Sequence, residues 1–164
     1  MSEEQATSDA SAVALASIIV RADENTAFRV FTEQIGTWWR RGTHYWNDSA
    51  RGLRLEFEPG LGGALREVYD EAGDDALEIG RITDWVPGKH LAYTWREDGW
   101  EDGTSTQVDI RFEPVDDGTL VTVVHSGWDR VGHGADGYDR GYEEGWNELL
   151  GWYADAARAV NADA

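Results

Sequence analysis

The sequence predicts an α+β fold. A curved antiparallel sheet of about seven strands surrounds one long C-terminal helix, with short helices between the first two strands. Two observations carry this prediction. Segments in which apolar and polar residues alternate follow one another from Leu53 to His125, with turn residues between them. From Tyr138 to Val160 the apolar residues instead recur at helical spacing. Such a helix must bury its apolar stripe, and the dry face of the sheet is the only large surface available.

The length predicts a single domain with a tail at each end. The chain has 164 residues, which is enough for one domain with a substantial core. Residues 1–12 are polar and acidic, and we expect them to form a disordered tail. The domain itself is expected over residues 13–160, with a short tail at 161–164.

The domain is expected to begin with a strand and a helical segment. The stretch from Val13 to Ala22 has a β-branched centre and is predicted as the first strand. Asp23 is placed to cap the following helix, because its carboxylate can accept from a free backbone N–H. Gly36 is expected to end or kink that helix. The apolar residues of this segment recur at helical spacing: Ala27, Phe28, Val30, Phe31 and Ile35.

Six further strands are expected after a loop from Arg40 to Ala50. Glycine, proline and aspartate mark the turns between them, as at Pro87-Gly88. The strand TQVDIRFEPV alternates most clearly and places Val108, Ile110 and Phe112 on a dry face. Because a turn separates each strand from the next, an antiparallel meander is the simplest topology.

The composition excludes several classes of function. The formal net charge is −18 at pH 7, and a chain this acidic repels nucleic acid and anionic membranes. There is no cysteine, so neither a disulfide nor a thiolate metal site can form. The longest apolar run near the N-terminus, Val13 to Val20, is too short to span a membrane, and no signal peptide is recognisable. We therefore expect a cytoplasmic protein with no membrane insertion. Its dispersed acids favour a solubilising surface over a docking face for a basic protein partner.

Five short motifs, in this order, resemble those of the START-like (SRPBCC) superfamily, which has the helix-grip fold. The branch they resemble most is named after the C-terminal domain of the activator of Hsp90 ATPase (AHSA1-like). The resemblance covers nearly all of the expected domain. The motifs are TWW at 37–39, Gly62-Gly63, GRITDWVPGKHLAYTW at 80–95, VTVVHSGW at 121–128 and GWNELLGWY at 145–153.

The resemblance implies a cavity between the sheet and the long helix that holds an apolar or aromatic small molecule. Members of the superfamily bind lipids, polyketides or hormones, and some are cyclases. Binding without catalysis is the favoured function. One alternative is an enzyme, a cyclase or hydrolase, that uses a cavity acid or histidine. The other is a chaperone-interacting protein like the Hsp90 ATPase activators. Those activators carry a separate N-terminal domain for which this chain has no room, which weighs against that alternative.

Six residues are predicted to line the cavity. Buried tyrosine and tryptophan suit a pocket wall, because each has an apolar body and a polar tip that needs a partner. Period two places Tyr93 with Trp95 on one strand face, and seven positions on a helix place Trp146 and Tyr153 on one stripe. A residue that ends the early helical segment would lie at the cavity mouth. The six residues are Trp39, Tyr93, Trp95, His125, Trp146 and Tyr153.

No residue is assigned a catalytic role, and no metal or cofactor is expected, because the four histidines match no zinc motif and no HExxH is present. His125 shares a strand face with Val121 and Val123. It either orients a ligand or is a structural histidine satisfied by a backbone carbonyl. Glu67 shares a face with Leu65, and it either pairs with an arginine or is a cavity acid with a raised pKa. The ligand identity and the oligomeric state stay open.

Overall fold

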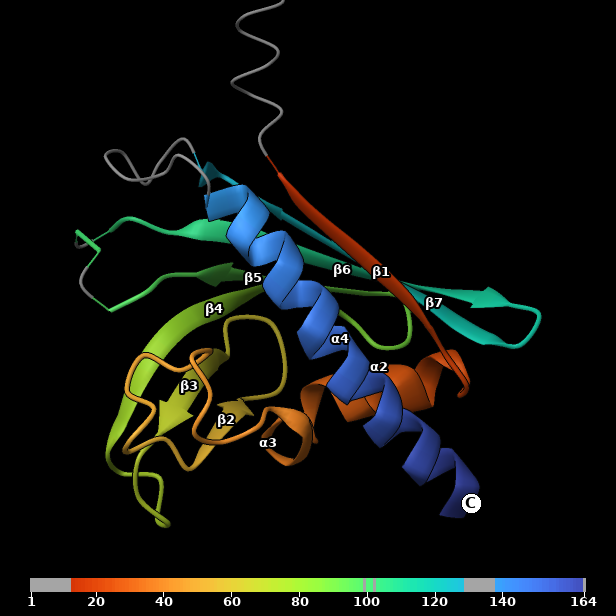
Figure 1. Cartoon of the computed structure of the whole chain (residues 1–164), viewed down its shortest axis with the longest axis horizontal. Coiled ribbons are helices and arrows are strands. Elements are labelled where there is room, and N and C mark those ends of the chain that lie inside the picture. The colour runs from red at the N-terminus through yellow and green to blue at the C-terminus, as the bar shows by residue number, and fades with distance from the viewer. Residues whose placement is uncertain (1–12, 99, 102, 129–137, 164) are drawn as a thin grey trace, which may run out of the picture.

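The computed structural model describes residues 13–98, 100–101, 103–128 and 138–163. Within these residues, seven strands form one curled antiparallel sheet shaped like half a barrel, and the long C-terminal helix crosses its concave side (Figure 1). This confirms the predicted α+β fold. The predicted tail at 1–12 lies outside the described residues. The segment predicted as a tail at 161–164 is helical as far as Asp163.

Seven strands and three helices make up the described part of the chain. The strands are β1 (Ala14–Val20), β2 (Arg54–Phe57), β3 (Ala64–Val68), β4 (Ala76–Val86), β5 (His90–Trp95), β6 (Thr106–Val115) and β7 (Gly118–Ser126). The helices are α2 (Glu24–Thr32), α3 (Ile35–Trp38) and α4 (Tyr138–Asp163). None of these helices combines the length and the apolar character that crossing a bilayer requires.

The strand order is β1-β7-β6-β5-β4-β3-β2, so the two strands nearest the N-terminus form the two edges of the sheet. Strands β2 to β7 form the predicted meander, and β1 pairs with β7. The chain between β1 and β2 must therefore pass from one edge to the other, and α2 and α3 lie on this path. Together with α4 they cover the concave face, and this is where the core sits.

The early helical segment is two helices, and the break differs from the prediction. Asp23 caps α2 as expected, because its carboxylate accepts from the backbone N–H of Thr26 at 2.7 Å. The chain breaks at Glu33 and Gln34, whereas Gly36 lies inside α3. The glycine is needed there for another reason. A Cβ at position 36 would lie 3.1 Å from the carbonyl oxygen of Leu55, so α3 packs closely on β2.

The curl of the sheet has local causes in β3, β4 and β5. The β3–β4 register shifts between Leu65 and Arg66, and the β4–β5 register shifts after Ile82; such irregularities bend a strand and increase its twist. Gly80 of β4 allows a very close approach, because a Cβ there would lie 1.7 Å from the carbonyl oxygen of Thr94. These features bend the long β4 strand around the core.

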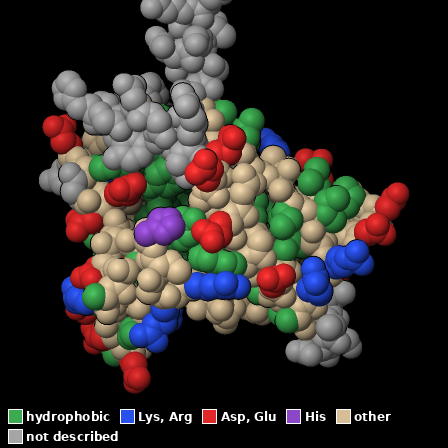
Figure 2. Space-filling view, viewed as in Figure 1, with side chains coloured by type: hydrophobic (Ala, Val, Ile, Leu, Met, Phe, Trp, Pro, Cys, Tyr) green, Lys and Arg blue, Asp and Glu red, His purple; other side chains and the backbone are tan. Residues whose placement is uncertain are grey.

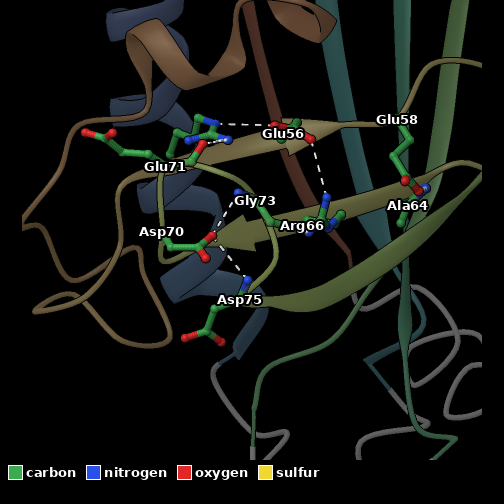
Figure 3. Close-up of polar contacts among 9 residues, drawn as sticks. Glu56, Glu58, Ala64, Arg66, Asp70, Glu71, Gly73 and Asp75 are labelled. Atoms are coloured by element: carbon green, nitrogen blue, oxygen red, sulfur yellow. Dashed lines mark hydrogen bonds and ion pairs between the residues drawn. The ribbon is translucent and has the colours of Figure 1, made fainter.

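Polar pairs cover the part of the sheet opposite the core. The carboxylate of Glu56 lies between two arginines, 3.3 Å from Nε of Arg54 and 3.5 Å from Nη1 of Arg66 (Figure 3). In the turn that follows β3, Asp70 accepts from the backbone N–H groups of Gly73 and Asp75 at 2.8 and 3.2 Å. These two half-buried acids are thus held by neighbours along the same hairpin.

Candidate ligand-binding site

Strands β5 and β7 end, and β6 and α4 begin, at the same end of the sheet (Figure 1). Ring contacts bring aromatic side chains together there. We call this group the aromatic cluster; it consists of Trp95, His125, Trp128, Tyr142 and Trp146. The ring of His125 lies at its centre, since the other four ring centroids are between 4.4 Å (Trp128) and 6.3 Å (Trp95) away. Figure 2 shows hydrophobic side chains in a recessed area below the start of α4, with acidic side chains around it.

The six residues predicted to line a cavity are all buried, with at most 7% of any one exposed. Four of them are linked ring to ring. The Trp39 and Trp95 rings lie 6.2 Å apart, and the rings of Trp95 and Trp146 both lie against His125, at 6.3 and 6.2 Å. The structure therefore brings together residues from the end of α3 and from β5, β7 and α4.

The other two predicted residues lie outside this linked group. Tyr153 packs against Phe31 and Trp38, with ring centroids 5.1 and 5.5 Å away. Tyr93 meets Phe57 edge-on at 5.2 Å, farther along the concave face. An open groove at the opposite end of the sheet is lined by residues 21–24, 114–115 and 117–118, and it includes none of the six. The cavity-lining role of the six stays a prediction.

His125 uses both ring nitrogens within the protein. Nδ1 accepts from the indole Nε1–H of Trp146 at 3.1 Å, and since an indole nitrogen only donates, Nδ1 carries no proton. Nε2 therefore carries the proton and donates to Oγ1 of Thr106 at 2.7 Å. That hydroxyl in turn donates to the carbonyl oxygen of Trp95 at 3.1 Å. Burial lowers the pKa of His125 to about 3, so the ring is neutral at physiological pH.

The polar tips of two other tryptophans are also bound. Trp95 donates from Nε1 to the hydroxyl of Tyr142 at 2.9 Å, and this hydroxyl donates to the carboxylate of Glu97. Trp39 donates from Nε1 to the carbonyl oxygen of Tyr45 at 3.2 Å. These bonds fix the orientation of the rings. The Tyr142 hydroxyl also binds the half-buried carboxylate of Glu97 to the aromatic cluster.

Tyr93 is the exception among the six. Only 1% of the residue is exposed, yet its hydroxyl has no hydrogen-bond partner among the described residues. Burial is the one cause that raises the pKa of this phenol. The equally buried Tyr153, by contrast, donates to the carbonyl oxygen of Ala27 at 2.7 Å.

Glu67 is a buried anchor for the loop before β2. Its carboxylate accepts from the backbone N–H groups of Asn47 and Asp48, each at 2.9 Å, and from the Tyr69 hydroxyl at 2.6 Å. The side-chain amide of Asn47 adds a fourth bond at 3.2 Å. The partners of Glu67 among the described residues are thus amides and a phenol, and not the arginine that one of the two predictions gave it. Asn47 also accepts from the backbone N–H of Asp98 at 2.8 Å, which ties this loop to the one after β5.

Four residues of this region were not among the predicted lining residues. Trp128 closes the motif VTVVHSGW, and Tyr142 lies on the apolar stripe of the last helix, so the sequence held a signal for both. Thr106 and Glu97 carry no such signal. Their place depends on which atoms of β7 and α4 lie across from them.

The sheet, the crossing helix and the aromatic site together define a helix-grip domain of the START-like class. The chain belongs to the family described as activator of Hsp90 ATPase homolog 1-like protein, whose family model matches residues 21–152. This confirms the resemblance seen in the five motifs. No match to a curated protein was found.

Solved structures of the same fold include proteins with different names. The anthrahydroquino-gamma-pyrone synthase Txn09, solved as a complex, is 28% identical; the match covers 88% of this chain and 96% of that one, with a TM-score of 0.59. Protein NE0264 from Nitrosomonas europaea is 16% identical over 92% and 96%, with a TM-score of 0.63. The Aha1 dimer from Colwellia psychrerythraea is 14% identical over 89% and 96%, with a TM-score of 0.57.

Proposed function

We propose that the protein binds an apolar or aromatic small molecule between the concave face of the sheet and α4, without changing it chemically. The observation that carries this proposal is the convergence of oriented aromatic rings from four separate elements on one end of the concave face. Ligand sites are typically lined by such side chains with few polar groups. The proposed walls are Trp39, Tyr93, Trp95, His125, Trp146 and Tyr153.

Tryptophan emission tests this proposal directly, because several indoles would lie in contact with the ligand. Titration with a panel of aromatic and fatty compounds is expected to quench the emission of the wild-type protein in a saturable way. Trp39→Phe should weaken binding severalfold, because Trp39 is a proposed wall residue. Trp85→Phe is the matched control, since Trp85 packs on Phe28 of α2 and not on the aromatic cluster. Absence of saturable quenching by any compound would refute the proposal.

A second candidate is a polyketide cyclase-like enzyme, and the 28% identity to a protein named a synthase favours it. In such an enzyme Glu97 is the best-placed acid or base. Both ring nitrogens of His125 and both oxygens of Glu67 are already engaged. One carboxylate oxygen of Glu97 has no hydrogen-bond partner in the described part of the chain. Mass spectrometry of the bound compound after incubation separates the two candidates, because only the enzyme changes its mass or its connectivity.

A further inference from the structure

We propose that the hydroxyl of Tyr93 is the hydrogen-bond donor that the site offers to its ligand, and that the ligand is a neutral apolar or aromatic molecule carrying a carbonyl oxygen. This inference rests on the proposed function, because it names the class of molecule that the same site takes.

The position of Tyr93 suits this role. It lies on β5, a strand in the interior of the sheet, where it pairs with Ile82 of β4 and Val108 of β6. Its neighbours in register are buried and apolar, and Phe57 meets its ring edge-on. A ligand between the concave face and α4 would meet few polar atoms there, so a single phenol O–H would decide its orientation.

The stability of the folded state also gives no reason for a hydroxyl at position 93. A buried hydroxyl without a partner destabilises the folded state, so phenylalanine would serve the core at least as well. The tips of Tyr153, Trp39, Trp95 and Trp146 all have protein partners. Among the aromatic residues of the proposed walls, the hydroxyl of Tyr93 is the one polar tip without a partner in the described part of the chain.

The chemistry of the group selects an acceptor. A phenol that stays protonated donates a hydrogen bond, and burial keeps this phenol protonated by raising its pKa. A neutral carbonyl accepts from it without bringing charge into a buried place. An anionic acceptor is disfavoured by the net charge of −18 and by the carboxylates of Glu67 and Glu97 on the same side of the sheet.

A matched pair of ligands tests the inference. 1-Tetralone and tetralin have the same two-ring skeleton and differ in one carbonyl oxygen. Isothermal titration of the full chain is expected to show binding of both, with 1-tetralone the tighter. Tyr93→Phe removes the hydroxyl and little else. It should weaken 1-tetralone by about tenfold, the effect of one lost hydrogen bond, and leave tetralin within about twofold.

Tyr69→Phe is the control, because Tyr69 is not one of the proposed wall residues and its hydroxyl already donates to the carboxylate of Glu67 at 2.6 Å. It should lower the thermal midpoint and leave the preference for 1-tetralone unchanged. Tyr93→Phe without ligand should show an unchanged or higher thermal midpoint, because no hydrogen bond is lost. A fall as large as that of Tyr69→Phe would mean that the Tyr93 hydroxyl has a structural partner, and the inference would be wrong.

The titrations separate this inference from the proposed function. If both compounds bind and Tyr93→Phe keeps the wild-type preference, the site exists but Tyr93 is not its donor. If neither compound binds to the wild-type protein, the inference is wrong, and so is the proposed site for molecules of this kind. A selective loss of 1-tetralone in Tyr93→Phe supports both.

Discussion

The indole N–H of Trp146 donates to Nδ1 of His125 at 3.1 Å, and this bond joins helix α4 to strand β7 inside the core. Both side chains are at least 98% buried. The bond also settles the tautomer of the histidine, which then donates to Thr106 at the start of β6. One tryptophan on the helix therefore orients a series of hydrogen bonds that runs from β7 to β6.

Trp146→Ala is expected to lower the free energy of unfolding by about 3–5 kcal/mol, as truncation of large buried aromatic residues does. The variant loses the packing of the indole and leaves Nδ1 of His125 without its donor. Denaturant unfolding followed by far-UV circular dichroism measures the change. Trp146→Phe keeps most of the packing and should cost clearly less. A stability equal to that of the wild type would show that this tryptophan does not hold α4 to the sheet.

The stability should decrease as the pH is lowered, because of His125. Burial depresses the pKa of this histidine to about 3 in the folded protein, from an ordinary value of 6.5. The unfolded chain therefore binds a proton that the folded protein does not bind. The stability that comes from the neutral His125 is fully present above about pH 6.5 and is lost as the pH falls toward 3. Over this range the free energy of unfolding falls with a limiting slope of about 1.4 kcal/mol per pH unit.

Urea unfolding at pH 7, 6 and 5 tests this dependence. His125→Asn cannot take up the proton, so its stability should fall less than that of the wild type over this range, even though the variant is less stable at pH 7. His44→Asn is the control, because His44 is exposed and lies outside the core, where its ring contacts that of Tyr45. Parallel stability curves for the wild type and His125→Asn would contradict the buried neutral state of His125.

Glu67→Gln is expected to destabilise the protein by about 2–3 kcal/mol, because a charged acceptor of four hydrogen bonds is lost and an amide N–H is turned toward other donors. The loop before β2 should loosen first. Trypsin cleavage after Arg40, Arg41 or Arg51 should then become faster than in the wild type. Glu71→Gln, at an exposed position in the turn after β3, should change neither stability nor cleavage. Unchanged cleavage in Glu67→Gln would mean that other contacts hold the loop.

Gly151→Ala is expected to stabilise the protein by about 0.5–1 kcal/mol, since alanine loses less conformational entropy in a helix. Gly151 lies within α4, and a Cβ there would meet no atom within 4 Å. Gly145→Ala is the comparison, because its Cβ would lie 3.1 Å from the ring of Tyr45. It should gain less or lose stability. Thermal unfolding measures both, and a lower midpoint for Gly151→Ala would contradict the open surroundings.

The local pattern of the sequence is sufficient for most of the fold. The alternation in β6 places Val108, Ile110 and Phe112 on the buried face, as the structure has them. Asp23 caps α2 as predicted. The break between α2 and α3 was misplaced, because Gly36 serves the approach to Leu55 of β2 and does not end a helix. The close contact between α3 and β2 requires a small residue at position 36. The spacing of apolar residues along the helix carries no information about that contact.

The sequence by itself determined which faces are dry, how many strands there are, and that a long helix must cover the sheet, because period two and period 3.6 depend only on neighbouring residues. The tertiary structure alone decided which polar atoms meet. Asn47 reaches Glu67, and Tyr142 reaches both Trp95 and Glu97, across separations of 20 residues or more. The curl of β4 and the strand register set these meetings. They also leave the hydroxyl of Tyr93 without a partner among the described residues, and the spacing of a single strand cannot reveal that.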